Sequence, residues 1–131
     1  MANRYYCSNG ERVSESVIKK RLSDAYKEWY LGKACPCSGC GGKAIETSHI
    51  IAKARCKELH KTDLIWHRHN SFPACRKCHL KWEAINNPEW CDLLNVDHCL
   101  AVLALHDQES YLKRLIIYEE NHISAKAVPG H

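Results

Sequence analysis

Two pairs of cysteines have the spacing of metal ligands. Cys37 and Cys40 lie in the sequence C-S-G-C, and Cys75 and Cys78 lie in C-R-K-C-H. Two C-x-x-C pairs at this separation are typical of a closed, tetrahedral zinc site with four thiolate ligands. Cys35 is a further candidate, but its longer gap to Cys40 does not match the second pair. We therefore predict a structural zinc ion bound by the two pairs.

Three polar residues lie between and beside these pairs. His49 is in S-H-I-I, Asn70 is in R-H-N-S-F-P-A-C, and His79 directly follows the last cysteine. Glu83 is four residues beyond His79, and residues at this spacing share one face of a helix. His79 and Glu83 would therefore reach the same ion. A surface salt bridge is the competing interpretation for Glu83, and a purely structural role is the competing interpretation for His49.

The order His, Asn, His between two C-x-x-C pairs resembles the HNH endonucleases, the zinc-braced branch of the ββα-metal nucleases. The resemblance covers residues 35–85. It depends on the intervals: a His near the end of a first strand, an Asn after a long loop, and C-x-x-C-H opening a helix nine residues past the Asn. It implies an α+β fold with a ββα-metal core, and metal-dependent hydrolysis of DNA as the activity.

The resemblance also implies a role for each polar residue. His49 would be the general base that deprotonates water, since an imidazole with a reference pKa of about 6.5 is neutral at pH 7. Asn70 would hold the loop that keeps His49 oriented. His79 would bind a catalytic divalent ion with Glu83. Magnesium or manganese suits a site with few protein ligands and several waters, whereas a His with a carboxylate also admits zinc or nickel.

One position departs from the family pattern. In many members the residue before the base is Asp or a second His that binds the ion, but here it is Ser48. A hydroxyl is a poor ligand for such an ion. The alternative function is therefore a catalytically inactive, zinc-braced module on the same fold, which binds nucleic acid or serves as an adaptor.

Charge is distributed unevenly along the 131 residues, whose net charge is +4. Residues 35–85 contain nine Lys or Arg against four acidic residues, and residues 86–131 contain three against seven. A basic core suits a polyanion, so we expect DNA as the partner, with ordinary surface charge as the competing interpretation. The residues expected to contact nucleic acid are Lys53, Arg55, Lys57, His67 and Arg68.

The elements that must position these residues form one domain with four parts. Residues 1–34 are expected to form an N-terminal extension, with a short strand or hairpin before an amphipathic helix from Glu15 to Gly32. The core, residues 35–85, is expected to contain a first strand over 43–50, a long basic loop over 51–66, a second strand from His67 through Phe72, and a helix over 76–85. Pro73 would either restrict the second strand to an edge position or end its ladder.

The C-terminal part is predicted to be helical. Asn87 followed by Pro is a strong helix start, and helices are expected over about 87–94, 96–105 and 108–121. Leu112, Leu115, Ile116 and Tyr118 would form one face of the last helix. These C-terminal helices, residues 86–123, are the candidate surface for a homodimer, and residues 124–131 are expected to be a flexible tail.

The sequence shows no charged-then-apolar signal segment, and no apolar run reaches the roughly 18 residues of a spanning helix. We therefore expect a cytoplasmic protein without a membrane partner, in which the nine cysteines are thiols or metal ligands rather than disulfides. The cysteines outside the two pairs are expected to be small buried hydrophobic residues: Cys7, Cys35, Cys56, Cys91 and Cys99.

Overall fold

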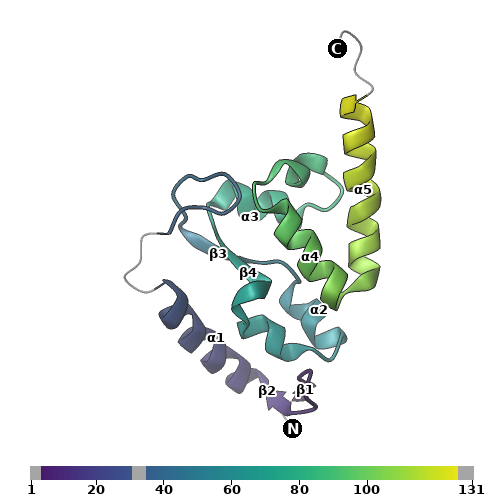
Figure 1. Cartoon of the computed structure of the whole chain (residues 1–131). Helices are drawn as coiled ribbons and strands as arrows, with labels where there is room; N and C mark the ends of the chain where they lie inside the picture. The colour runs from purple at the N-terminus through teal and green to yellow at the C-terminus, as the bar shows by residue number, and fades with distance from the viewer. Residues whose placement is uncertain (1–3, 31–34, 127–131) are drawn as a thin grey trace.

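The computed structural model describes residues 4–30 and 35–126, which form a small α+β fold (Figure 1). Within these residues, five α-helices, two small antiparallel sheets and three 3-10 helices (η) follow one another. Helix α1 and the α4–α5 pair lie on opposite sides of the part that contains β3, β4, α2 and α3 (Figure 1). The bounds are β1 Arg4–Tyr6, β2 Arg12–Ser14, α1 Glu15–Tyr30, β3 Glu46–His49, α2 Lys53–Glu58, η1 Thr62–Trp66, η2 Arg68–Asn70, β4 Ser71–Ala74, α3 Arg76–Glu83, η3 Pro88–Asp92, α4 Val96–His106 and α5 Gln108–Lys126.

The N-terminal strands β1 and β2 form an antiparallel hairpin, which confirms the predicted hairpin before the first helix. Gly10 has a φ of 90° in the connecting turn, a conformation that glycine adopts without strain. Helix α1 follows directly and packs against η1. Gly32, where we expected this helix to end, lies outside the described residues.

Strands β3 and β4 pair antiparallel, with Glu46 opposite Ala74 and His49 opposite Ser71. Each strand is an edge of this two-stranded sheet, so Pro73 fits in β4 as predicted, without interrupting a central ladder. The sheet therefore brings the residue before the second cysteine pair next to the beginning of β3.

Both strands are shorter than predicted. Lys43 is bridged to Pro36 and closes the turn of the first cysteine pair, so β3 begins three residues later. Residues Arg68–Asn70 form the 3-10 turn η2, so β4 begins at Ser71 rather than at His67. The backbone thus turns immediately before β4, where the sequence pattern indicated an extended chain.

The prediction of a long basic loop over residues 51–66 was wrong, because this segment folds into α2 and η1. Helix α2 has no side-chain cap at its N-terminus, and Cys56 is its one buried residue. A helix of six residues is marginal by itself. It is held by a contact distant in sequence, since Arg55 donates to both carboxylate oxygens of Asp107 at 2.9 and 3.0 Å.

Helix α3 carries the second cysteine pair and His79. Its N-cap is Cys75, whose Sγ accepts the backbone N–H of Cys78 at 3.4 Å. Near its other end, the indole Nε1 of Trp82 donates to the carbonyl of Ile50 at 2.9 Å. The Trp82 bond therefore ties this end of the helix to the residue that follows β3, and the other end follows β4 directly.

After α3 the chain forms a 3-10 helix in place of the predicted α-helix to about residue 94. Asn87 caps it as predicted, accepting the N–H of Glu89 at 3.3 Å. The helix stops at Asp92, and the N–H of Leu94 donates to the carbonyl of Gly39 at 2.9 Å. This bond joins the segment to the turn of the first cysteine pair, which prevents it from continuing as a helix.

Helix α5 extends to Lys126, so the first three residues of the predicted flexible tail, residues 124–131, are helical. Residues 127–131 lie outside the described part of the chain. No Gly or Pro occurs between the start of α5 and Pro129, so the sequence contains no strong signal to end the helix at Asn121.

The buried face of α5 also differs from the predicted one. Leu112 and Ile116 are 54% and 59% exposed, whereas Arg114 is only 6% exposed. The guanidinium of Arg114 lies 3.6 Å from the ring centroid of Trp82, and its Nη2 donates to the carbonyl of that residue at 2.9 Å. A cation over an indole ring replaces the expected apolar contact.

All nine cysteines are free thiols. Four of the five outside the two pairs are buried as predicted, and Cys35 is only partly buried. Among the described residues, no helix combines the length and the apolar character needed to cross a membrane.

Candidate functional site

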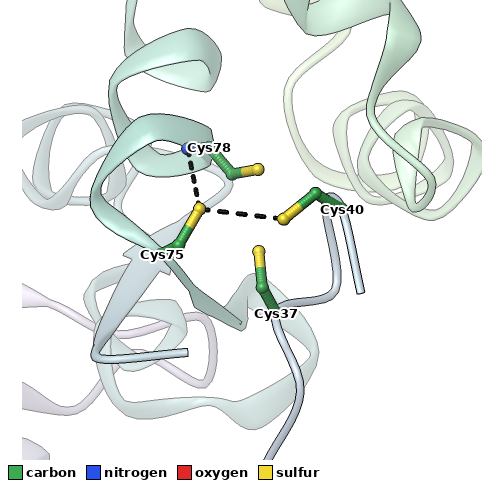
Figure 2. A group of neighbouring side chains, drawn as sticks. All are labelled: Cys37, Cys40, Cys75 and Cys78. Carbon is green, nitrogen blue, oxygen red and sulfur yellow. Dashed lines mark hydrogen bonds between the residues drawn. The ribbon is translucent and has the colours of Figure 1, made fainter. Parts of the chain in front are cut away.

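The sulfur atoms of Cys37, Cys40, Cys75 and Cys78 converge from two turns that are distant in sequence (Figure 2). All four lie within 4.8 Å of one another, and those of Cys40 and Cys75 are 3.8 Å apart. Tetrahedral zinc–sulfur bonds of about 2.3 Å place sulfurs about 3.8 Å apart. The predicted grouping is therefore confirmed, and Cys35 is not part of it. In the described ranges no other group of three or more Cys, His, Asp or Glu has such closely placed ligand atoms.

The first cysteine pair lies in a turn closed by its own backbone. The N–H of Cys37 donates to the carbonyl of Gly42 at 2.6 Å, and the N–H of Gly41 donates back to the carbonyl of Cys37 at 2.8 Å. Gly41 has a φ of 78°. At Gly39, an added Cβ would lie 2.9 Å from the Cβ and Sγ of Cys78. Glycine is thus required for the two cysteine turns to approach each other.

Electrostatics within this four-thiol centre favour a cation. Burial by itself would raise the pKa of Cys37, but hydrogen bonds from the backbone at Cys75, Gly39 and Cys40 lower it to about 7. Burial and the neighbouring thiols raise the pKa of Cys78. The centre therefore stabilises one thiolate and resists further negative charge, a repulsion that a bound divalent metal removes. Four soft ligands at tetrahedral spacing fit zinc.

His49 is the last residue of β3, and its ring is largely enclosed. Its Nε2 lies 2.8 Å from the carbonyl oxygen of Ile65. Because a carbonyl only accepts, Nε2 carries the proton and Nδ1 carries the lone pair. No group in residues 4–30 or 35–126 forms a hydrogen bond with Nδ1. Burial, the main cause, lowers the pKa of His49, so its ring is neutral and able to accept a proton at pH 7.

Asn70 is fully buried, and its side chain forms three hydrogen bonds with the backbone between the two strands. Its Oδ1 accepts the N–H of Ile51 at 2.8 Å, and its Nδ2 donates to the carbonyls of Ile51 and Leu64, each at 3.1 Å. Leu64 directly precedes Ile65, whose carbonyl holds the His49 ring. Asn70 therefore fixes the backbone that orients His49.

His79 lies between two carboxylates. Its Nδ1 is 2.9 Å from an oxygen of Glu46, and its Nε2 is 2.7 Å from an oxygen of Glu83, at the predicted i+4 position. A neutral imidazole can donate to only one of them, so the other contact requires a second proton or a cation. An imidazole nitrogen beside carboxylate oxygens is a suitable ligand set for a divalent cation.

Glu46 is the residue that the sequence prediction missed at this site. It begins β3, three residues before His49, and its second oxygen lies 3.6 Å from Arg76. The available signal was its place in the predicted first strand, which has to lie beside the helix that carries His79. Recognising the contact required the register of β3 and the orientation of α3, and neither follows from the intervals alone.

A cavity of about 360 Å³ brings these groups to one space. It is lined by His49, His79 and Glu83, by the exposed Lys53 at the start of α2, and by Tyr26 of α1. A second cavity of about 430 Å³ shares His49 and Glu83 with the first and extends toward α4 and α5. The two histidines of the predicted motif thus face the same cavity, with a lysine beside them.

The five residues predicted to contact nucleic acid differ in their availability. Lys53 and Arg68 are exposed, and neither forms an ion pair with any residue that the structure describes. Arg55 and Lys57 are both engaged in ion pairs with acidic residues of the protein. His67 is hydrogen-bonded to a neighbouring histidine. Lys53 and Arg68 are therefore the cations of this group that are free for a ligand.

Ser48 lies opposite Phe72 in the sheet, and its side chain is completely buried. Its Oγ has no hydrogen-bond partner in the described ranges. Adjacent residues of a strand point to opposite faces, so the hydroxyl is directed away from His49. Ser48 is therefore not placed to bind an ion beside His49.

Comparisons with known proteins identify no relative. No protein-family model matches the chain, and no significant match was found among the curated proteins or the solved structures.

Proposed function

We propose that the protein is a metal-dependent endonuclease of the HNH type that hydrolyses phosphodiester bonds in DNA. The observation that carries the proposal is the state of His49: its Nε2 is bonded to a carbonyl, its Nδ1 retains a free lone pair, and its ring lines the same cavity as His79 and Glu83. A general base and a cation-binding group in one cavity are what phosphodiester hydrolysis requires.

In this proposal Nδ1 of His49 removes a proton from water while the water oxygen attacks phosphorus. The bond from phosphorus to the 3′ oxygen breaks, and the departing oxygen takes a proton from solvent. The products carry a 5′ phosphate and a 3′ hydroxyl. Asn70 and the carbonyl of Ile65 keep the imidazole in the tautomer and orientation that the proton transfer needs.

His79, Glu83 and Glu46 would hold a divalent cation, magnesium or manganese. When bound, the cation would neutralise the negative charge that develops on the phosphate. The four-thiol centre would hold zinc in a closed site without catalytic function. Its effect would be to fix the start of α3 relative to β3, which keeps His79 and His49 in register. A reduced, cytoplasmic location that keeps these thiols available is part of the proposal.

Lys53 and Arg68 would contact the phosphates of the substrate. The position of Lys53 supports such a contact, because its side chain is exposed and lines the cavity with His49. It would therefore meet the phosphate that is cleaved or the next phosphate along the strand. Arg68 lies in η2, directly before the histidine and asparagine that lead into β4. Arg55 and Lys57, which are already paired with carboxylates, would instead stabilise the position of α2.

The second candidate function is a zinc-braced nucleic-acid-binding or adaptor module without catalysis. The observation that favours it is the buried position of Ser48, where many HNH enzymes have an ion ligand. In that case the four-thiol centre and the basic core would have the same roles, and His79 with its two carboxylates would form an ion-pair network only.

Incubating the purified, zinc-loaded protein with different nucleic acids would separate the two functions. The substrates would be duplex, nicked, branched and single-stranded DNA and an RNA duplex, each with magnesium, manganese or a chelator. The nuclease proposal predicts cleavage of at least one DNA form that requires the added metal and leaves 5′ phosphates. Binding without cleavage of any form in either metal would favour the inactive module.

A single copy of this site would cut one strand, so a double-strand cut would need a homodimer. The C-terminal helices remain the candidate surface, because Leu105, Leu112 and Ile116 are exposed on α4 and α5. Sedimentation velocity of the protein and of the Leu112→Lys variant would test this part of the proposal. A monomer in both samples would exclude a dimer through these helices.

A further inference from the structure

Four of the nine histidines lie together where η2 meets α4. Nδ1 of His69 is 2.5 Å from Nδ1 of His67, and Nε2 of His69 is 2.9 Å from Nε2 of His106. His98 adds a contact from its Nε2 to the carbonyl of His69 at 3.1 Å. The proposed nuclease reaction uses none of these contacts, although His67 and His69 lie just before Asn70 in the sequence.

Lys61 determines the direction of the hydrogen bonds in this group. Its Nζ lies 3.5 Å from Nδ1 of His106 and 3.2 Å from the carbonyl of the same residue. An ammonium group can only donate, so Nδ1 of His106 is the acceptor and its Nε2 carries the proton. Nε2 of His69 must then accept, which leaves the proton of His69 on Nδ1, and His67 accepts on its own Nδ1.

We propose that Lys61, His106, His69 and His67 form a proton-sensitive clamp, a directional chain of hydrogen bonds that joins η2 to the C-terminal end of α4 only while all three rings are neutral. Each ring nitrogen inside the chain has one assigned role, donor or acceptor. A further proton on any of the three rings turns an acceptor into a donor. Two N–H groups then point at each other, and the chain breaks at that link.

The surroundings keep the His69 and His106 rings neutral at pH 7. The pKa of His69 is lowered to about 4. Burial is the largest cause, followed by the nearby rings of His67, His106 and His98. The pKa of His106 is also lowered, mainly by burial and next by the charge of Lys61. Protonation of either ring would therefore place a positive charge among groups that already disfavour it.

Negative groups near the clamp are few and are already engaged. Asp63 of η1 raises the pKa of both His69 and His106 slightly against these effects, but its carboxylate also accepts two hydrogen bonds from Ser8. Asp107, next to His106, is bound by Arg55. Among the described residues, no carboxylate lies within ion-pair distance of the three rings, so protonation has little compensation.

The clamp acts on the candidate site through Asn70. His69 directly precedes Asn70, whose side chain holds the carbonyls of Ile51 and Leu64. Opening of the clamp in acid would release η2 and with it the backbone that orients His49. For activity, this consequence rests on the proposed nuclease function, whereas the hydrogen-bond chain itself does not.

Ring-nitrogen NMR of the zinc-loaded protein at pH 7.5 tests the chain directly. We expect His69 to be protonated on Nδ1, which is the minor tautomer of a free imidazole, and His106 to be protonated on Nε2. In the Lys61→Met variant the donor that fixes the direction is absent, so both tautomers of His69 should appear. Lys20→Met, on the exposed side of α1, is the control and should leave the tautomers unchanged. His69 protonated on Nε2 in the parent would overturn the proposal.

Thermal melting between pH 8 and pH 6 with excess zinc tests the sensitivity to protons. The folded-state pKa of His69 and of His106 is below the unfolded value of about 6.5, so the melting temperature should fall as the pH drops below that value. In Lys61→Met the fall should be smaller, because without this cation the folded-state pKa of His106 lies closer to the unfolded value. Melting curves that shift with pH equally in the parent, Lys61→Met and Lys20→Met would contradict the clamp.

The two proposals fail separately. If the tautomers and the melting behaviour follow the chain but no nucleic acid is cleaved, the clamp stands and the nuclease function fails. If DNA is cleaved while His69 is protonated on Nε2, the nuclease function stands and the clamp fails.

Discussion

The four-thiol centre and the cavity beside His49 are assembled to different degrees by the fold. In the four-thiol centre, all ligand atoms lie within 4.8 Å of one another, and one sulfur pair already has the spacing of a zinc tetrahedron. In the cavity, His79 meets its two carboxylates on opposite sides of its ring, and His49 is bonded elsewhere. The first group is arranged as a closed metal site could be, whereas in the second the candidate ligands still face each other.

Under the proposed function, the difference follows from what each group would do. A structural metal contributes to folding, so its ligands are brought together by tight turns such as those at Gly39 and Gly41. A reactive site must admit a phosphate, water and a weakly held cation, so it needs open space and groups with spare hydrogen-bonding capacity. Nδ1 of His49 and the exposed amine of Lys53 have this capacity.

The comparison predicts the largest effect for a change in the four-thiol centre. Cys78→Ser should abolish zinc binding and leave the protein unfolded, because structural zinc contributes on the order of 10 kcal/mol and the whole domain is stable by about 5 to 15 kcal/mol. Cys35→Ser, outside the centre, is the matched control. Circular dichroism and metal analysis provide the measurement, and native-like melting of Cys78→Ser without zinc would rule out the structural assignment.

A smaller effect is expected at Asn70, which belongs to the cavity but acts through buried hydrogen bonds. Asn70→Asp retains the acceptor for Ile51 but cannot donate to the two carbonyls, and should cost about 3 to 5 kcal/mol. Denaturant unfolding with zinc present measures the loss. Asn121→Asp, near the end of α5, is the control. A loss below about 1 kcal/mol would mean that these bonds do not hold the loop.

The sequence predicted the four-thiol centre fully because its information is local: two short turns with fixed spacing define the ligands. The roles of His49, Asn70 and His79 stay predictions from a motif. The motif did not include Glu46, whose contact with His79 depends on strand register. The sequence did not predict α2 because Arg55 is paired with an aspartate 52 residues away. The burial of Arg114 was missed for a similar reason, because its guanidinium packs over the ring of Trp82 on another helix.

A still smaller effect, on metal affinity, is expected at the carboxylates around His79. Glu83→Gln should raise the magnesium or manganese concentration needed for half-maximal cleavage by roughly 10- to 100-fold, and Glu46→Gln should act in the same direction. Glu119→Gln on the exposed side of α5 is the control. Metal titrations of cleavage decide the point. If Glu83→Gln titrates like the parent protein, Glu83 forms a salt bridge and is not a ligand.

The smallest effect is the pH dependence of His49 itself. Burial lowers the folded-state pKa of this ring below the unfolded value, so the unfolded chain binds more protons as the pH falls below about 6.5. The contribution of the His49 ring to the stability of the fold is thus present above that pH and decreases below it. NMR titration of the His49 ring should give a midpoint below 6.5, with His122 on α5 as the exposed reference. A midpoint above 7 would contradict the inferred burial and leave a smaller neutral fraction for catalysis.

Cleavage of a supercoiled plasmid by the parent and by His49→Ala tests the central claim most directly. Both proteins would first be shown to contain one zinc and to melt alike, so that the four-thiol centre is intact in each. With magnesium or manganese added, the parent should nick the plasmid, and His49→Ala should be slower by about 10²- to 10⁴-fold, the usual contribution of a general base. Equal cleavage by the two zinc-loaded proteins would show that His49 is not the base.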